Sequence, residues 1–253
     1  MKRIVLFGTG NVATHLFEAY KNSADFKIIQ VYNHASKSLQ AFKDQVAITT
    51  DLDEISPADI YILALKDDIL ADVCQKMKET DALVVHTSGA ISIEVLSKFK
   101  NHGVFYPLQT FSKNKKVDFS EIPICIETNT SANTNTLKDL ASEISGKIFP
   151  ISSEQRKLLH VAAVFVSNFV NFLYTEGEKL CKDNQIPFEI LHPLILETAS
   201  KVTNMSPLEA QTGPAKRNDQ KVISSHLELL NEEQHKIYTL LTLSIQNLHG
   251  KEL

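Results

Sequence analysis

Two glycines near the N-terminus have the spacing of a dinucleotide-binding turn. Gly8 and Gly10 follow the apolar run 3–7, and Ala13 completes the pattern Gly-x-Gly-x-x-Ala at the start of a helical stretch. In such a turn the first glycine permits the tight bend, and the second lets the backbone approach a pyrophosphate. The N–H groups and the positive dipole end of the helix attract the phosphates. We therefore interpret this segment as a cofactor-binding turn, with an ordinary glycine turn as the alternative; its expected contacts are Gly8, Thr9, Gly10, Asn11 and Val12.

The end of the second expected strand indicates which dinucleotide is preferred. NAD-binding folds usually place a carboxylate there to bind the ribose hydroxyls, whereas this sequence has Asn33. A neutral amide does not repel a 2′-phosphate, and Ser36 and Lys37 add a hydroxyl group and a positive charge nearby. His34 is a further candidate contact. These residues predict NADP(H) in preference to NAD(H); the alternative is that Ser36 caps a helix and Lys37 is solvated.

Polar residues also follow the later expected strands, where ligands of parallel sheets bind. Leu65 and Lys66 follow the third strong strand, and we expect them beside the cofactor. Ser88 follows the fourth and is a candidate catalytic residue at the nicotinamide end. Gln109 and Thr110 follow the next strand and are candidate substrate contacts. Each has the alternative of a turn or capping residue, and for Ser88 the two interpretations are about equally weighted.

A long helical stretch in the second half contains two further candidates. Residues 154–184 are apolar nearly all round near His160, which predicts a central, buried helix. A buried polar group needs a partner or a purpose. His160 is therefore the candidate acid or base, and Asn168 the candidate catalytic residue that orients the substrate. The alternative is a core histidine whose hydrogen bonds are satisfied, with Asn168 bonded to a neighbouring loop.

A polar, turn-rich loop between two later helical stretches provides the last candidate. Residues 212–219 contain Arg217, which could bind an anionic substrate, and Asp219. A surface ion pair between these two side chains is at least as well supported by composition. The sequence therefore predicts Arg217 as a substrate-binding residue with that alternative kept open.

The elements that must position these residues divide the chain in two. Residues 1–151 alternate strands with helices, which predicts an α/β domain with a doubly wound, mainly parallel sheet of the Rossmann type. Residues 152–253 show helical patterns only and predict an all-α domain. The expected strands are 3–8, 27–32, 60–65, 82–86, 103–106, 123–127 and 147–150. The expected helices are 12–21, 38–43, 68–78, 93–98, 133–145, 154–184, 188–205, 220–230 and 233–248.

Composition excludes several classes of protein. The 253 residues include 26 Lys and Arg against 30 Asp and Glu, a net charge of −4 that argues against nucleic-acid binding through a broad basic surface. The three cysteines are widely spaced, which indicates neither a disulfide framework nor a metal site. We expect no segment with the run of about 18 apolar residues that spans a membrane. The sequence thus predicts a soluble cytoplasmic protein.

Taken together, the motifs resemble one family. Gly8-x-Gly10-Asn11-Val12, residues 86–90 (His-Thr-Ser-Gly-Ala), residues 105–112, His160 with Asn168, and residues 212–219 occur in this order. The chain is similar to the predicted short-subunit dehydrogenase-like oxidoreductases, which have a Rossmann-like domain and a helical domain of unknown function. Their layout resembles that of NADP-dependent pyrroline-5-carboxylate reductases, ketopantoate reductases and deazaflavin-dependent NADP oxidoreductases. The helical half resembles the C-terminal domain of 6-phosphogluconate dehydrogenase.

The resemblance implies NADP bound at the glycine turn, a small substrate in a cleft between the domains, and a homodimer formed by the helical halves. A deazaflavin or flavin co-substrate is compatible with it. One position departs from the wider group, in which hydroxyacid dehydrogenases use a Lys-x-x-x-Asn pair. If Asn168 matches that Asn, the Lys position is Val164, which cannot transfer a proton. Two functions therefore stay open: an NADP-dependent oxidoreductase, or a protein that binds or senses NADP without catalysis.

Overall fold

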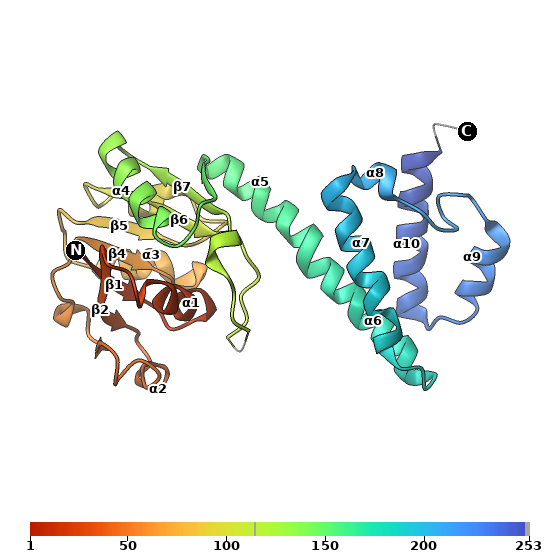
Figure 1. Cartoon of the computed structure of the whole chain (residues 1–253), viewed down its shortest axis with the longest axis horizontal. Coiled ribbons are helices and arrows are strands. Elements are labelled where there is room, and N and C mark those ends of the chain that lie inside the picture. The colour runs from red at the N-terminus through yellow and green to blue at the C-terminus, as the bar shows by residue number, and fades with distance from the viewer. Residues whose placement is uncertain (114, 251–253) are drawn as a thin grey trace. The chain divides into compact units, whose positions relative to one another are not determined.

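The computed structural model describes residues 1–113 and 115–250 of the chain (Figure 1). The chain divides into two compact units, Met1–Ser167 and Asn168–Leu253. The first unit contains all the strands of the described residues together with the first part of a long helix. We describe each unit by itself.

The first unit is built on one eight-stranded sheet with the order β3-β2-β1-β4-β5-β6-β7-β8. Neighbouring strands are parallel except β6 and β7, which are antiparallel. This confirms the predicted Rossmann-type α/β fold followed by helices. The strands are β1 (Lys2–Phe7), β2 (Phe26–Tyr32), β3 (Ala47–Thr49), β4 (Ile60–Leu63), β5 (Leu83–His86), β6 (His102–Pro107), β7 (Ile124–Thr128) and β8 (Ile148–Pro150).

The central strands are buried on both faces, as their apolar composition predicts. Side chains alternate along β1, so that Ile4 and Leu6 join one core cluster while Val5 and Phe7 join the other. Strand β4 is buried over its whole length. This double burial holds the carboxyl ends of β1, β4 and β5 side by side, where the candidate cofactor turn lies.

The helices of the first unit are α1 (Asn11–Tyr20), α2 (Ser36–Leu39), α3 (Asp67–Lys76) and α4 (Ser131–Ser142). Short 3-10 turns occupy Leu52–Glu54, Ile93–Leu96 and Phe119–Glu121. The helix expected at 93–98 is therefore wrong: Ser92 caps a single 3-10 turn there. Strand β3 was not expected, because three residues are too short for a hydrophobic alternation to be visible.

From Ser153 onward the described residues, up to Gly250, contain helices and no strand, as predicted. Helix α5 (Ser153–Ala163) continues through a π-helical segment (Val164–Phe169) into α6 (Val170–Asp183). The remaining elements are the 3-10 turn Phe188–Leu191, α7 (His192–Asn204), α8 (Pro207–Ala210), α9 (Gln220–Leu227) and α10 (Glu232–His249).

The prediction that the long helix is buried is wrong for the single chain. Leu158 is 73% exposed and Val166 is 75% exposed, and the helix presents other large apolar side chains to solvent. An apolar helix surface shows only that something must cover it, and the described residues of this chain do not. The expectation that no segment could span a membrane also needs correction. Residues 153–183 form one helix, and an 18-residue window within it has a mean hydropathy of 1.5, which passes that test by length and composition alone, as core helices of water-soluble proteins also do.

The start of α5 is closed by two side chains. Ser152 is the N-cap, and Gln155 completes a capping box with it. The hydroxyl of Ser153 instead donates to Glu127 at 2.8 Å. Ser153 therefore attaches the helix to strand β7 rather than closing its first turn.

A buried ion pair completes this attachment. The Arg156 side chain is 1% exposed and donates to Oε2 of Glu127 at 2.5 Å; Glu127 is 18% exposed. A second guanidinium nitrogen donates to the carbonyl of Ile91 at 2.5 Å. Removing one member of such a pair leaves an uncompensated buried charge, which costs far more than the pair contributes. The pair and Ser153 thus fix the first turns of α5 at the end of the sheet.

We expect Glu127→Gln to destabilise the first unit by about 3–5 kcal/mol, because Arg156 would remain buried without its counter-charge. The measurement is the free energy of unfolding from urea denaturation of the full chain. Glu121→Gln is the control, since the ion pair of Glu121 with Lys147 is exposed and its loss should cost about 1 kcal/mol or less. Equal effects of the two substitutions would contradict this account of the α5 anchor.

Candidate functional site

Gly8 lies at the carboxyl end of β1, where the chain turns towards α1. Its φ is +106°, a conformation that L side chains rarely adopt. A Cβ atom at this position would lie 2.2 Å from the carbonyl oxygen of Ala64, which follows β4. Gly8 is therefore required by the neighbouring strand, irrespective of any ligand.

Gly10 differs from Gly8 in what it faces. It is the N-cap of α1 with a φ of −73°, which any residue can adopt, and a Cβ there would meet nothing within 4 Å. The first turn of α1 contains no acidic residue, and Gly10 offers no side-chain cap. The positive end of the helix is thus left open to an anion, as the binding of a pyrophosphate requires. The residues of this turn fit a dinucleotide.

The other turn residues have separate surroundings. Thr9 is buried, and Val12 packs against the core cluster of the sheet. The side-chain amide of Asn11 donates to the carbonyl of Phe111 at 2.7 Å. Asn11 therefore ties the start of α1 to the segment that follows β6, where Gln109 and Thr110 lie.

The structure places Asn33 at the end of β2, as predicted, but gives it a local role. Asn33 is buried, and its amide donates to the hydroxyl of Ser38 at 2.7 Å and to the carbonyl of Ala35 at 3.3 Å. These bonds shape the turn into α2. The N-cap of α2 is Ala35, so the alternative interpretation of Ser36 as a cap is wrong.

Three predicted contacts lie on this turn with their side chains in solvent: His34, Ser36 and Lys37. Their exposure leaves a cation and two polar groups available at the end of β2. After β4, Cδ2 of Leu65 lies 3.6 Å from the Cβ position of Gly8. Lys66 is exposed at the N-cap of α3. Leu65 thus lies beside the glycine turn.

Ser88 builds a turn after β5. Its hydroxyl oxygen accepts the backbone N–H groups of Ala90 and Ile91, both at 3.1 Å. The backbone N–H of Ser88 donates to Nδ1 of His86 at 3.2 Å. The alternative of a turn residue therefore describes what Ser88 does in the folded chain, and these bonds use only the acceptor capacity of its hydroxyl.

His86 is the last residue of β5, immediately before this turn. It is fully buried, and its Nε2 has no hydrogen-bond partner among the described residues. Burial, with the positive charge of Arg156 as a second cause, lowers the pKa of His86 to about 3. The imidazole is therefore neutral, and its Nδ1 accepts the N–H of Ser88.

Strand β6 places Tyr106 beside His160. This contact was not predicted from the sequence. The hydroxyl of Tyr106, in β6, lies 3.1 Å from Nδ1 of His160, in α5. Gly89 lies against both rings: a Cβ atom there would come within 2.7 Å of Nδ1 of His160 and of Cζ of Tyr106. Burial raises the pKa of Tyr106 to about 12, so that its phenol is protonated at neutral pH. Tyr106 looked like an ordinary strand residue, and only the fold reveals its partner.

Three further candidates, Gln109, Thr110 and Asn168, are exposed. The side-chain oxygen of Gln109 accepts the backbone N–H of Thr110 at 2.8 Å, and both residues are exposed. Asn168 is exposed in the π-helical segment and belongs to the second compact unit.

Arg217 is also exposed in the second unit. The alternative of an ion pair between Arg217 and Asp219 is not observed in the described residues. Asp219 instead caps α9 by accepting the N–H of Val222. The guanidinium of Arg217 therefore has no counter-charge from Asp219.

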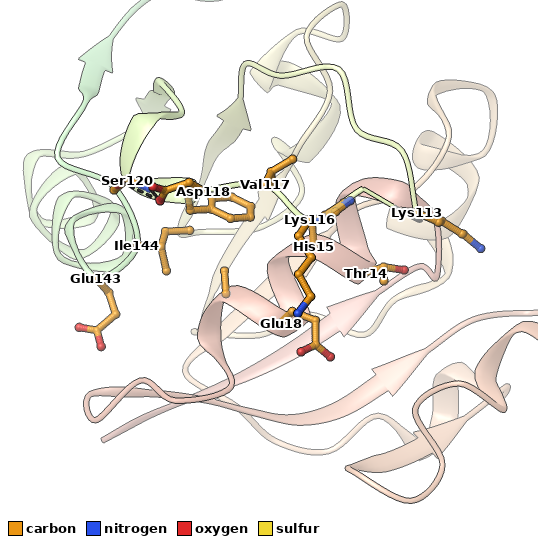
Figure 2. A pocket seen from close by; sticks show the side chains of 12 residues that line it. Thr14, His15, Glu18, Lys113, Lys116, Val117, Asp118, Ser120, Glu143 and Ile144 are labelled. Carbon is orange, nitrogen blue, oxygen red and sulfur yellow. Dashed lines mark hydrogen bonds between the residues drawn. The ribbon is translucent and has the colours of Figure 1, made fainter.

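A cavity of about 680 Å³ lies on the flank of α1 (Figure 2). Thr14, His15 and Glu18 line it from α1, together with the segment that contains Lys116 and Asp118. The ring of His15 packs on Phe111 with centroids 5.1 Å apart, and its Nε2 lies 3.0 Å from the carbonyl oxygen of Ser112. The cavity therefore forms where the chain after β6 crosses α1, and it contains none of the predicted site residues.

Two family models match successive parts of the chain. Residues 3–89 match the family described as coenzyme F420-dependent NADP oxidoreductase, and residues 122–245 match a domain of unknown function, DUF2520. No protein of curated function matches the sequence.

Several solved structures share the fold over nearly the full length. BF3122 from Bacteroides fragilis, whose proposed activity is that of an NADP oxidoreductase, is 42% identical, with a TM-score of 0.89 over 97% of this chain and 98% of that chain. TM1727 from Thermotoga maritima is 22% identical, with a TM-score of 0.81 over 98% and 99%. A pyrroline-5-carboxylate reductase from Coxiella burnetii is 17% identical, with a TM-score of 0.60 over 98% of both chains. The last two show similarity of fold alone.

We expect the buried His86 to make the first unit sensitive to acid. Its pKa is about 3 in the folded chain against an ordinary value of 6.5, so the unfolded chain binds the proton first as the pH falls. The stability that depends on the neutral imidazole is complete above pH 6.5 and is lost below it. Between pH 7 and pH 5 this group should lower the free energy of unfolding by about 2 kcal/mol.

His86→Asn tests this pH dependence, because an amide oxygen can still accept the N–H of Ser88 but does not titrate. Urea denaturation at pH 7 and pH 5 gives the free energies to compare. A variant that loses as much stability as the wild type over this interval would show that His86 is not the source.

Proposed function

This chain belongs to the family of BF3122 from Bacteroides fragilis, and on that premise we propose that it is an NADP-dependent oxidoreductase acting on a small substrate. The observation that carries the proposal is the contrast between Gly8 and Gly10. The fold requires the first, whereas the second faces open space at an uncapped helix N-terminus. No protein atom would clash with a side chain at Gly10, so the missing side chain leaves room there for a ligand.

Each part of the cofactor has residues suited to hold it. The turn with Gly8, Thr9, Gly10, Asn11 and Val12 would bind the pyrophosphate. The exposed residues His34, Ser36 and Lys37, with the neutral Asn33, would bind a 2′-phosphate in preference to free ribose hydroxyls. Leu65 and Lys66 would border the cofactor at the end of β4. When bound, the nicotinamide would supply or accept a hydride, and the match to the F420-dependent family is compatible with a deazaflavin or flavin as co-substrate.

The residues at the ends of β5 and β6 would form the reacting end. His160 is the candidate acid or base, and Ser88 would orient the substrate through the hydrogen that its turn contacts leave available. Gln109 and Thr110 would contact the substrate from the segment after β6. Asn168 and Arg217 keep the roles expected for them, orientation and binding of an anionic group.

A second function has its own observation in favour. If Asn168 matches the Asn of the hydroxyacid dehydrogenases, Val164 stands where they have their lysine, and valine cannot transfer a proton. The chain would then bind or sense NADP without catalysis. Binding of NADPH with no turnover of carbonyl, imine or alcohol substrates would support this alternative.

For the assembly, we propose a soluble cytoplasmic homodimer associated through the helical half, without nucleic acid or membrane. Large apolar side chains that lie exposed on two helices of the second unit, α7 and α10, support a partner surface: Leu194, Leu196, Leu240, Leu243 and Leu248. Exposed apolar area of this extent is typical of an interface. A second copy of the chain presents the same surface, as a two-fold dimer requires.

Calorimetric titration with NADPH, NADP and NADH tests the cofactor assignment. We expect micromolar binding of NADPH and weaker binding of NADH. Gly10→Asp should abolish both, and Gly10→Ala should weaken NADPH binding by about tenfold or more, because a Cβ atom would occupy the approach of the phosphates.

Gly146→Ala is the matched control for Gly10→Ala, since a Cβ there also meets nothing within 4 Å. It should leave both folding and NADPH binding unchanged. Absence of binding to any dinucleotide in the wild type would overturn the oxidoreductase and the sensing function together.

The proposed dimer is tested by sedimentation analysis of Leu196→Glu. Leu196 is 70% exposed in α7, and a carboxylate there should shift a dimer towards monomer because it would have to be desolvated. Phe149→Glu is the control: this aromatic residue is 50% exposed in β8, outside the helical half, and its change should leave the association intact. A wild-type chain that sediments as a monomer at micromolar concentration would contradict the dimer.

A further inference from the structure

We propose that Tyr106 donates its phenolic hydrogen to Nδ1 of His160 and thereby keeps the proton of the neutral imidazole on Nε2. Tyr106 is then a positioning residue, and His160 meets the substrate as a hydrogen-bond donor. The substrate class that follows is a carbonyl compound or an imine, whose oxygen or nitrogen accepts that hydrogen bond. This inference rests on the proposed function, in which His160 contacts the substrate.

The geometry holds the two rings in one arrangement. The hydroxyl of Tyr106 lies 3.1 Å from Nδ1 of His160, and the rings meet edge to face with centroids 6.2 Å apart. Gly89 closes the space on one side, because a Cβ atom there would come within 2.9 Å of the tyrosine hydroxyl. On the other side of the histidine, α5 is fixed one turn earlier by Arg156 and its bond to Glu127. The backbone at Gly89 and the ion pair of Arg156 with Glu127 therefore fix the positions of Tyr106 and His160.

The direction of the hydrogen bond follows from the tyrosine. Because the pKa of Tyr106 is raised to about 12 by burial, its hydroxyl keeps its hydrogen at neutral pH. Within the described residues, Nδ1 of His160 is the one hydrogen-bond partner of that hydroxyl. If His160 were the donor, the phenolic hydrogen would lack a protein acceptor in a half-buried place, which is unfavourable. Donation by Tyr106 satisfies both groups.

The consequence lies at the other ring nitrogen. A neutral imidazole that accepts at Nδ1 has its hydrogen on Nε2 and can only donate there. His160 is half-buried, and its Nε2 has no hydrogen-bond partner among residues 1–113 and 115–250. A neutral imidazole can polarise a substrate carbonyl group by donating a hydrogen bond to it. The arrangement suits a substrate that is to be reduced better than an alcohol or amine that must first lose a proton to a base.

Nitrogen NMR of the full chain, with ¹⁵N-labelled histidine and at a pH where the imidazoles are neutral, tests the proposal directly. We expect His160 to show a protonated Nε2 and an unprotonated, hydrogen-bonded Nδ1. Tyr106→Phe should move the Nδ1 resonance of His160 towards that of an unbonded histidine. A wild-type His160 protonated at Nδ1, or a resonance unchanged in Tyr106→Phe, would overturn the proposal.

The chain contains a matched control. His226 and Tyr238 form a second histidine–tyrosine pair, with the hydroxyl 2.8 Å from Nδ1, in the helical unit. Tyr238→Phe should therefore change the resonance of His226 and leave that of His160 in place. Gly89→Ala provides a second variant if Tyr106→Phe folds poorly, because its Cβ should separate Tyr106 from His160 and produce the same change in the His160 spectrum.

A titration with NADPH separates this inference from the proposed function. Tyr106→Phe should bind NADPH within about twofold of the wild type, because Tyr106 is not part of the glycine turn. Absence of NADPH binding in the wild type would overturn the proposed function and with it the substrate class. Normal NADPH binding together with a proton on Nδ1 of His160 would overturn this inference and leave the proposed function in place.

Discussion

The buried pair of Arg156 and Glu127 is the constraint on which the candidate site depends. It joins the first turns of the long helix to strand β7 and, through the carbonyl of Ile91, to the loop after β5. His160 follows Arg156 by one helical turn and so arrives beside Tyr106 and Gly89. A buried ion pair is a poor source of stability but is well suited to fixing a geometry, because its partners cannot separate without leaving a charge unsolvated. Here the geometry that it fixes is the position of one imidazole ring.

The two glycines of the cofactor turn are needed for different reasons, one for the fold and the other for the ligand. Gly8 adopts a positive φ and lies against Ala64, so that its lack of a side chain serves the sheet. Gly10 has an ordinary conformation and open space before it, so that its lack of a side chain serves whatever approaches the helix. The motif in the sequence already suggests different reasons for the two glycines, and the structure supplies the contact with Ala64 that requires Gly8 and the open space at Gly10.

Much of the architecture could be predicted because its cause is local. Continuous apolar runs identify β1, β4 and β5, and the glycine turn is defined by residues a few positions apart. What could not be predicted depends on distant partners. Tyr106 and His160 are 54 residues apart and Glu127 and Arg156 are 29 apart, so no local pattern connects them. The exposure of the long helix was missed for a related reason: apolar composition demands a cover but does not say which chain provides it.

The π-helical segment Val164–Phe169 has a consequence for the register of the long helix. A π turn contains an extra residue compared with an α turn, and such turns often occur at functional sites. One residue corresponds to about 100° around an α-helix. A helical wheel with 3.6 residues per turn therefore misplaces the side chains within this segment. An insertion or deletion of one residue here would change which of its side chains follow one another along the helix.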